Sequence, residues 1–82
     1  MLKTIETPVT ELKAGDLIFD IQPESAMMNP MLFKVLKINN NTLVTEGMGD
    51  GSNKGYYFSY IDDKKCATFS ISSKSTWYKL IY

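Results

Sequence analysis

The chain has 82 residues, which is the size of one domain and excludes a second. Its hydrophobic content of 44% is too high for a disordered chain, and five Tyr, four Phe and one Trp supply bulky side chains for a core. The formal net charge is zero and all nine basic residues are Lys, so the chain has no overall positive field and no guanidinium fork for nucleic acid. We expect a single domain over residues 1–82.

The cysteine count and the first residues bear on the cellular compartment. Cys66 is the one cysteine, so no internal disulfide can form. The N-terminal stretch lacks the apolar region of a signal peptide, and no run approaches the roughly 20 apolar residues of a membrane helix. Lys without Arg, with frequent Asn, Ile and Tyr, is typical of an AT-rich genome. We therefore expect a cytoplasmic protein of a bacterium or of an infected bacterial host.

The N-terminal part of the chain predicts a strand, a bend and a second strand. Residues 1–7 form the first strand, Pro8 ends it, and residues 10–12 form one helical turn or a tight bend. Gly15 and Asp16 form a turn, in which Gly15 takes a positive φ. Period-two alternation then predicts another strand. Its expected inward face is Leu17, Phe19 and Ile21, and its expected outward face is Ile18, Asp20 and Gln22.

The start of this second strand carries the short motif Leu-x-x-Gly-Asp-Leu, made by Leu12, Gly15, Asp16 and Leu17. The motif resembles the start of the first long strand in many small SH3-like barrels. It is also similar to the Gly-Asp-Leu strand of NlpC/P60-type cysteine peptidases, but that family needs a Cys upstream and a His downstream, and this chain has neither. The resemblance therefore implies an SH3-like fold and no activity.

Residues 32–46, LFKVLKINNNTLVTE, are predicted to form a β-hairpin. Two runs of good strand formers flank the three Asn of residues 39–41, and Asn tolerates the positive φ of a tight turn. Apolar groups fall on both faces of the first run, which is typical of a central strand. Phe33 and Val35 share one face, and Leu32, Leu36 and Ile38 share the other.

Two long loops separate the predicted strands. The first, residues 22–31, contains the methionines Met27, Met28 and Met31. These side chains either cap the open end of a barrel or form an adaptable contact surface for a partner. The second, residues 47–55, has four Gly and carries Met48. It fits no phosphate loop, dinucleotide fingerprint or EF-hand, and we expect a hairpin loop that closes over a partner.

Residues 56–61 predict an aromatic strand. One face carries Tyr56, Phe58 and Tyr60, and the other carries Tyr57, Ser59 and Ile61. One face is expected to pack in the core, and the other then leaves at least one Tyr near solvent. The second face is either ordinary cross-strand packing or a stacking platform for bases.

The C-terminal part predicts two turns and two strands. Residues 62–64 and 72–75 are the turns, and the last strand is expected to pair with an N-terminal one. The strand between the turns alternates, with Ala67, Phe69 and Ile71 inward and Cys66, Thr68 and Ser70 outward. Cys66 has neither a His nor a second thiol as a partner in this sequence, so we expect it to be structural.

These elements predict an all-β fold, a small antiparallel barrel or sandwich of five to seven strands, most similar to SH3-like barrels. The sequence contains no His, no Arg and no second Cys, and its carboxylates fall mainly in loops and turns. We therefore expect no enzyme, no catalytic residues, no cofactor and no metal site.

Our leading hypothesis is a non-enzymatic protein-binding module, such as a phage or mobile-element protein that inhibits a host factor. The candidate contact residues are Met27, Met28, Met31, Met48, Tyr56, Tyr57 and Tyr60. One alternative is a small β-barrel that binds nucleic acid through Tyr stacking and a local patch of Lys64, Lys65, Lys74 and Lys79. A further alternative is a small-ligand binder that uses the barrel mouth. The sequence leaves open a monomer or a homodimer through an edge strand.

Overall fold

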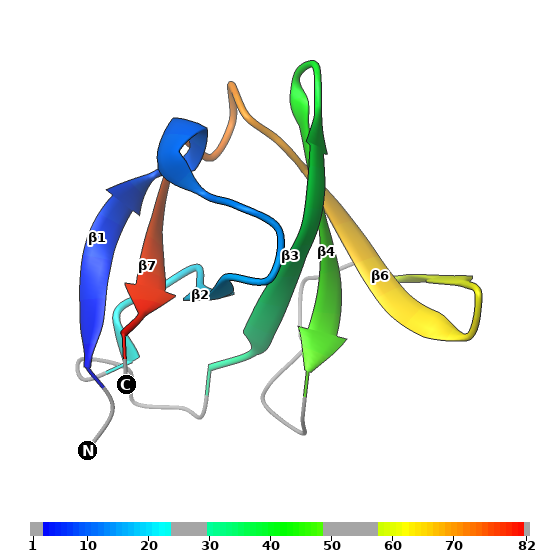
Figure 1. The fold of residues 1–82 in the computed structure, drawn as a ribbon, viewed down its shortest axis with the longest axis horizontal. Helices are drawn as coiled ribbons and strands as arrows, with labels where there is room; N and C mark the ends of the chain where they lie inside the picture. Colours follow the sequence, from blue (N-terminus) through cyan, green and yellow to red (C-terminus); the bar gives the residue numbers. More distant parts are fainter. Residues whose placement is uncertain (1–2, 24–29, 49–57, 82) are drawn as a thin grey trace.

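The computed structural model describes residues 3–23, 30–48 and 58–81, and in these residues seven strands form one antiparallel sheet (Figure 1). The strands are β1 (Thr4–Pro8), β2 (Leu17–Phe19), β3 (Leu32–Asn39), β4 (Thr42–Met48), β5 (Ser59–Ile61), β6 (Lys64–Ser70) and β7 (Thr76–Leu80). One 3-10 turn, η1 (Val9–Glu11), follows β1 at the predicted bend. The predicted all-β class is confirmed.

The order of strands in the sheet is β1-β7-β2-β3-β4-β6-β5. β2, β3 and β4 are neighbours in chain order, β6 lies beside β4 with β5 on its outer side, and β7 returns to lie between β1 and β2. The predicted pairing of the last strand with an N-terminal strand is confirmed, because Thr4 lies opposite Leu80 and Pro8 opposite Thr76. β1 and β5 are the two outer strands of this sheet.

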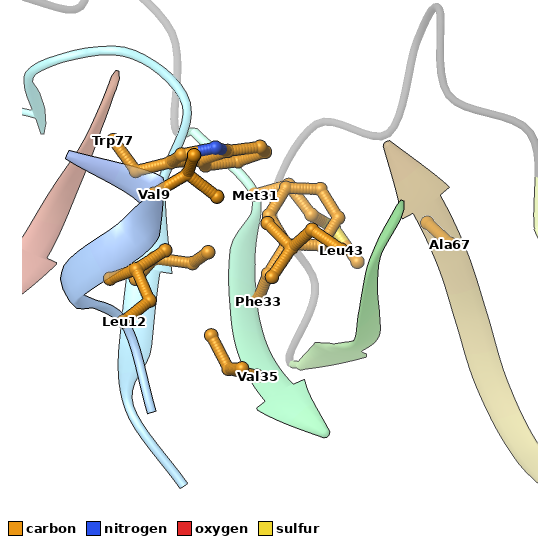
Figure 2. Close-up of a cluster of buried hydrophobic side chains, with 9 residues drawn as sticks. Val9, Leu12, Met31, Phe33, Val35, Leu43, Ala67 and Trp77 are labelled. Atoms are coloured by element: carbon orange, nitrogen blue, oxygen red, sulfur yellow. The ribbon is translucent and has the colours of Figure 1, made fainter. Parts of the chain in front are cut away.

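The core lies on the inner face of the sheet, where aromatic rings from distant strands meet (Figure 2). The Phe33 ring of β3 lies 5.4 Å from the Phe69 ring of β6 and 6.2 Å from the Trp77 ring of β7, edge to face in both pairs. The Phe69 and Trp77 rings are 4.8 Å apart. Because β6 and β7 are not neighbours in the sheet, the sheet must curl until their side chains meet. The buried cluster consists of Val9, Leu12, Ile18, Met31, Phe33, Val35, Leu43, Ala67 and Trp77.

The predicted faces of β2 are wrong. Ile18, expected to face outward, is fully buried in the core, whereas Ile21, expected to face inward, is 48% exposed. Phe19 is also buried, but it lies outside the core cluster, opposite Tyr78 of β7. Ile18 and Phe19 are adjacent in this three-residue strand and point to opposite faces, and since both are buried, both faces of β2 are covered. Alternation in sequence cannot choose the inward face of such a strand.

The predicted β3–β4 hairpin is confirmed, with Asn40 at a φ of 46° in its turn. Phe33 and Val35 face the core as expected. Ile38, expected on the opposite face, packs against the same core. The register shifts between Val35 and Lys37, and this β-bulge returns Ile38 to the inner face.

The alternation predicted for β6 is confirmed on its inner side, since Ala67 is in the core and Phe69 and Ile71 pack against it. Cys66 was expected to face outward into solvent but is buried. Its backbone lies between two strands, opposite Glu46 of β4 and Ser59 of β5. Ala67, the next residue, points to the opposite face and is also buried, so both faces of β6 are covered at this point.

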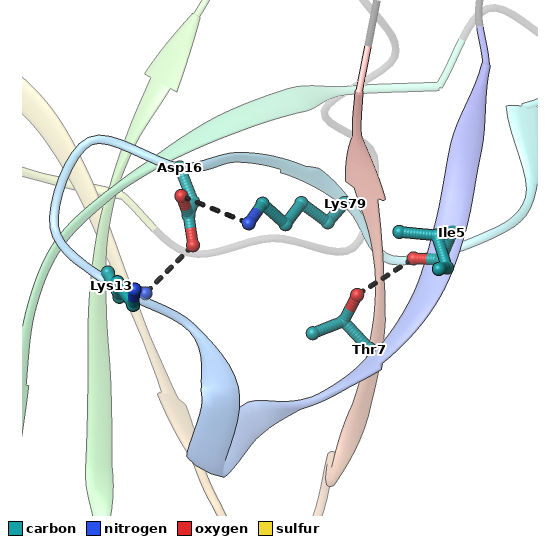
Figure 3. A network of polar contacts seen from close by, with 5 residues as sticks. All are labelled: Ile5, Thr7, Lys13, Asp16 and Lys79. Carbon is teal, nitrogen blue, oxygen red and sulfur yellow. Dashed lines mark hydrogen bonds and ion pairs between the residues drawn. The ribbon is translucent and has the colours of Figure 1, made fainter.

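The predicted turn before β2 is held against the sheet by Asp16 (Figure 3). The Asp16 carboxylate accepts a hydrogen bond of 2.8 Å from the backbone N–H of Lys13 and lies 3.6 Å from the Lys79 ammonium of β7. The Gly15 N–H donates to the Val35 carbonyl, and the Val35 N–H donates to the Asp16 carbonyl, both at 2.8 Å. Gly15 has a φ of 96°, the conformation expected of it.

Candidate interaction site

The end of the sheet at β5 and β6 is a two-stranded projection. β4 pairs with β6 as far as Cys66, which lies opposite Glu46. Beyond Cys66, β6 pairs with β5 and with no other strand of the described chain. The hairpin therefore extends past the body of the sheet, as the yellow ribbon in Figure 1 shows. We call residues 59–65 the hairpin arm.

The turn of the hairpin arm is specified by two aspartates. Ile61 lies opposite Lys64, so the loop has two residues, Asp62 and Asp63. Their φ angles are 52° and 64°, as a type I′ turn requires. Asp accepts this left-handed conformation more readily than most side chains, and the twist of the turn matches the twist of paired strands. The turn predicted at this position is confirmed, and it gives a short hairpin a defined geometry.

The side chains of β5 are all exposed. Tyr60 is 75% exposed and Ile61 is 52% exposed, and as neighbours in a strand they point to opposite faces of the hairpin arm. The expectation that one face of this aromatic strand is core is wrong for β5, because the strand runs beyond the body of the sheet. It holds for Phe58, just before β5, which packs against the core.

The base of the hairpin arm is anchored by aromatic and aliphatic contacts. The Phe58 ring stacks near the Phe33 ring, with centroids 6.5 Å apart, and the Lys65 ammonium lies 4.5 Å from the Phe58 centroid. A Cβ added to Gly47 would lie 2.6 Å from the Met31 Cε atom and 3.1 Å from the Phe58 Cε1 atom. Gly47 therefore gives room for the two side chains that join the arm to the core.

Three of the predicted contact residues, Met31, Met48 and Tyr60, lie in the described part of the chain, and they differ in exposure. Met31 is 1% exposed and belongs to the core, so the prediction that it contacts a partner is corrected: it packs inside the fold. Met48 is half-buried at the end of β4, opposite Leu32. Tyr60 is the exposed member of the set in the described part of the chain. Met27, Met28, Tyr56 and Tyr57 lie outside the described residues.

Sequence reasoning missed Ile61 as a candidate contact residue. The Asp62-Asp63 turn directly after Ile61 indicated that this side chain would be exposed. A strand residue beside a solvent-exposed hairpin turn is seldom covered by other strands. Ile5 on β1 is a further large apolar side chain that is exposed, at 54%.

The four lysines of the predicted basic patch lie apart. Lys64 and Lys65 belong to the hairpin arm, at one end of β6. Lys74 follows the other end of that strand, where its ammonium donates to the Asp20 carbonyl at 2.8 Å and lies 5.5 Å from the Trp77 ring centroid. Lys79 contacts Asp16. The structure thus leaves two lysines, and not four, near Tyr60.

Known proteins and metal chemistry give no further guide to the site. Residues 3–23, 30–48 and 58–81 contain no group of three His, Cys, Asp or Glu side chains placed to hold a metal ion. None of the helical structure in those ranges is long and apolar enough to cross a membrane. Comparisons with models of protein families, with curated proteins and with solved structures gave no match to this chain.

Proposed function

We propose that this chain is a non-enzymatic protein-binding module and that its hairpin arm enters a groove on another protein. The observation that carries this proposal is the 75% exposure of Tyr60 on a hairpin that leaves the sheet. Tyr is enriched among the residues that dominate binding energy in protein interfaces, and it contributes large contact area at a low cost in side-chain entropy.

The charge of the hairpin arm supports a protein partner over a polyanion. Asp62 and Asp63 offset Lys64 and Lys65, so the arm has no net charge. The apolar side chains Tyr60 and Ile61 lie on opposite faces of the arm, with the charged turn at its tip. A groove with apolar walls and a polar end complements this pattern, as a buried interface centre with a polar rim does.

We propose an SH3-like barrel as the scaffold. The curl of the sheet supports it, because β7 returns beside β2 and its Trp77 ring meets the Phe69 ring of β6, as in a small antiparallel sheet that closes toward a barrel. A phage or mobile-element protein that inhibits a host factor would act by binding of this kind, and the Lys-only basic composition supports that origin.

A nucleic-acid-binding small barrel is the second candidate. Tyr60 lies opposite Lys65, and an exposed aromatic ring beside a cation is the arrangement on which bases of a single strand stack. Salt separates the two candidates, because phosphate binding weakens steeply as salt increases whereas a mainly apolar protein contact does not.

The test is a tagged pull-down from lysate of the source organism or its host, with wild type, Tyr60→Ala and the control Ile21→Ala, each with and without nuclease. Ile21 is also a large exposed side chain but lies outside the hairpin arm. Our proposal predicts a discrete protein that survives nuclease, is retained by Ile21→Ala and is weakened about 30-fold by Tyr60→Ala, as loss of a hot-spot residue implies. Equal retention by both variants would refute the role of the arm, and loss on nuclease treatment would favour the second candidate.

A further inference from the structure

No described strand pairs with the outer edge of β1, and the direction of its backbone groups can be assigned. The Ile81 N–H donates to the Lys3 carbonyl at 2.9 Å, and the Val9 N–H donates to the Ser75 carbonyl at 2.8 Å. Lys3 and Val9 directly flank β1, and Ser75 and Ile81 directly flank β7, so both bonds continue the β1–β7 register at odd-numbered residues of the first strand. In an antiparallel pair, hydrogen-bonded residues alternate with residues whose backbone groups point away. The N–H and C=O groups of Thr4 and Glu6 therefore point to the outer edge.

The same edge carries exposed isoleucines. Ile5 is 54% exposed and Ile81, just after β7, is 47% exposed. Ile81 lies opposite Lys3, and Lys3 and Ile5 are two residues apart in a strand, so both isoleucines are on the same face. Diagonal neighbours of this kind are close enough for side-chain contact. An apolar pair thus adjoins a row of backbone donors and acceptors that no strand in the described ranges pairs with.

We propose that β1 pairs antiparallel with β1 of a second copy of this chain, with the two-fold axis beside Ile5. In this register Ile5 lies opposite Ile5 of the other copy, and Thr4 lies opposite Glu6 in both halves. The outward N–H and C=O groups of Thr4 and Glu6 then form about four backbone hydrogen bonds. The Ile5 pair occupies a non-hydrogen-bonded position, where Cα atoms approach to about 4.5 Å and side chains make the closest contact.

Charge and the apolar contact of Ile5 select this register over its neighbours. A register centred on Glu6 places two carboxylates directly opposite each other, which is destabilising. A register centred on Thr4 places Ile5 opposite Lys3 and loses the apolar contact. Pro8 has no N–H, but it lies beyond the Thr4 and Glu6 pairs and removes none of their bonds. The edge is therefore self-complementary in the Ile5-centred register, which is what an isologous dimer requires.

The dimer uses the sheet edge opposite to the hairpin arm, because β1 and β5 end the strand order on different sides. Pairing through β5 offers less, since Tyr60 is the one residue of that three-residue strand whose backbone points outward. A dimer through β1 consumes one edge of each copy and closes. It leaves two arms available, so a partner with two binding sites would gain avidity without any new contact.

The test is sedimentation equilibrium of the full chain as a function of concentration. The wild-type chain is expected to dimerise. Ile5→Lys places two ammonium groups at the two-fold axis and is expected to remain monomeric at chain concentrations up to about 1 mM, so that any remaining association is negligible in strength. Thr4→Glu places carboxylates opposite Glu6 and is expected to weaken the dimer about 10-fold, summed over the two symmetric pairs. Thr4→Glu with Glu6→Lys restores opposite charges and is expected to recover the wild-type affinity.

Circular dichroism and thermal melting establish that each variant is folded. If Ile5→Lys does not fold, the Thr4 and Glu6 variants test the register by themselves. Both positions lie on the outer strand β1, so these substitutions are expected to leave the chain folded. A wild-type chain that stays monomeric at about 1 mM overturns the proposal. If Ile5→Lys still dimerises, or if the double variant of Thr4 and Glu6 fails to recover the wild-type affinity, the Ile5-centred register is wrong, and so is the role of Ile5 in the dimer.

Discussion

Replacement of Phe33 by Leu tests the ring cluster that holds the curled sheet together. Phe33 is fully buried, and its ring meets the rings of Phe58, Phe69 and Trp77 at centroid distances of 6.5, 5.4 and 6.2 Å. Leu keeps an apolar side chain at the site but removes all three ring contacts. The substitution therefore separates aromatic geometry from burial as such.

The expected loss follows from the ring distances. An aromatic pair with centroids about 4.5–7 Å apart contributes about 0.5–1.5 kcal/mol to stability beyond the burial of its rings. The two edge-to-face contacts of Phe33 lie within these distances. For these two contacts together we expect Phe33→Leu to lower the free energy of unfolding by about 1–3 kcal/mol, as a range because neighbouring contacts are not additive. A chain of 82 residues has a total stability of about 4–12 kcal/mol, so this loss is a large part of it.

Urea denaturation followed by tryptophan fluorescence measures the loss directly. Trp77 is the one tryptophan, it is fully buried, and it belongs to the same cluster, so its emission reports on the core. The control is Met31→Leu, an equally buried and nearly volume-conserving change that is expected to cost less than about 1.5 kcal/mol. If Phe33→Leu costs no more than Met31→Leu, the rings contribute only through burial and the reasoning is wrong.

Two further predictions concern single backbone and hydroxyl interactions. Thr45 is fully buried, and its hydroxyl donates to the Ala67 carbonyl at 2.9 Å. Thr45→Val is therefore expected to lower the free energy of unfolding, measured by urea denaturation, by about 1 kcal/mol, whereas the control Thr68→Val, at an exposed position, changes it little. Equal effects of the two substitutions would contradict the importance of the bond. Gly15 has a φ of 96°, and a Cβ added to it would have no atom within 4 Å. Gly15→Ala is therefore expected to lower the free energy of unfolding by about 1–2 kcal/mol through backbone strain alone. An unchanged melting temperature would show that the turn adapts.

Local signals predicted the features of the fold that are themselves local. The Asn and Asp turns and the alternation of β6 were predictable because two-residue loops and period-two burial depend on neighbouring residues. The inward face of β2 was not predictable from its sequence, because it depends on which other parts of the chain cover each face of the strand. The bulge after Val35 was not either, since an extra residue in one strand leaves no mark in composition.

The candidate site shows the same limit. Tyr60 was among the predicted contact residues, but its aromatic neighbours in sequence favoured a partly buried strand. Its exposure follows from where β4 stops pairing with β6, at Glu46 and Cys66, which is a non-local fact. Met31 was misassigned for the complementary reason, because a methionine in a loop sequence gives no sign that Gly47 of another strand leaves space for it.

The most direct test of the central claim, that the hairpin arm contacts a partner protein, is photo-cross-linking from within the arm. A benzophenone amino acid replaces Tyr60 in one sample and the exposed Ile21 in a second, and both are irradiated in lysate of the source organism or its host. Our account predicts a discrete cross-linked protein from position 60 and none of that mass from position 21. Cross-links of equal yield from both positions, or from position 21 alone, would contradict the assignment of the arm as the binding surface.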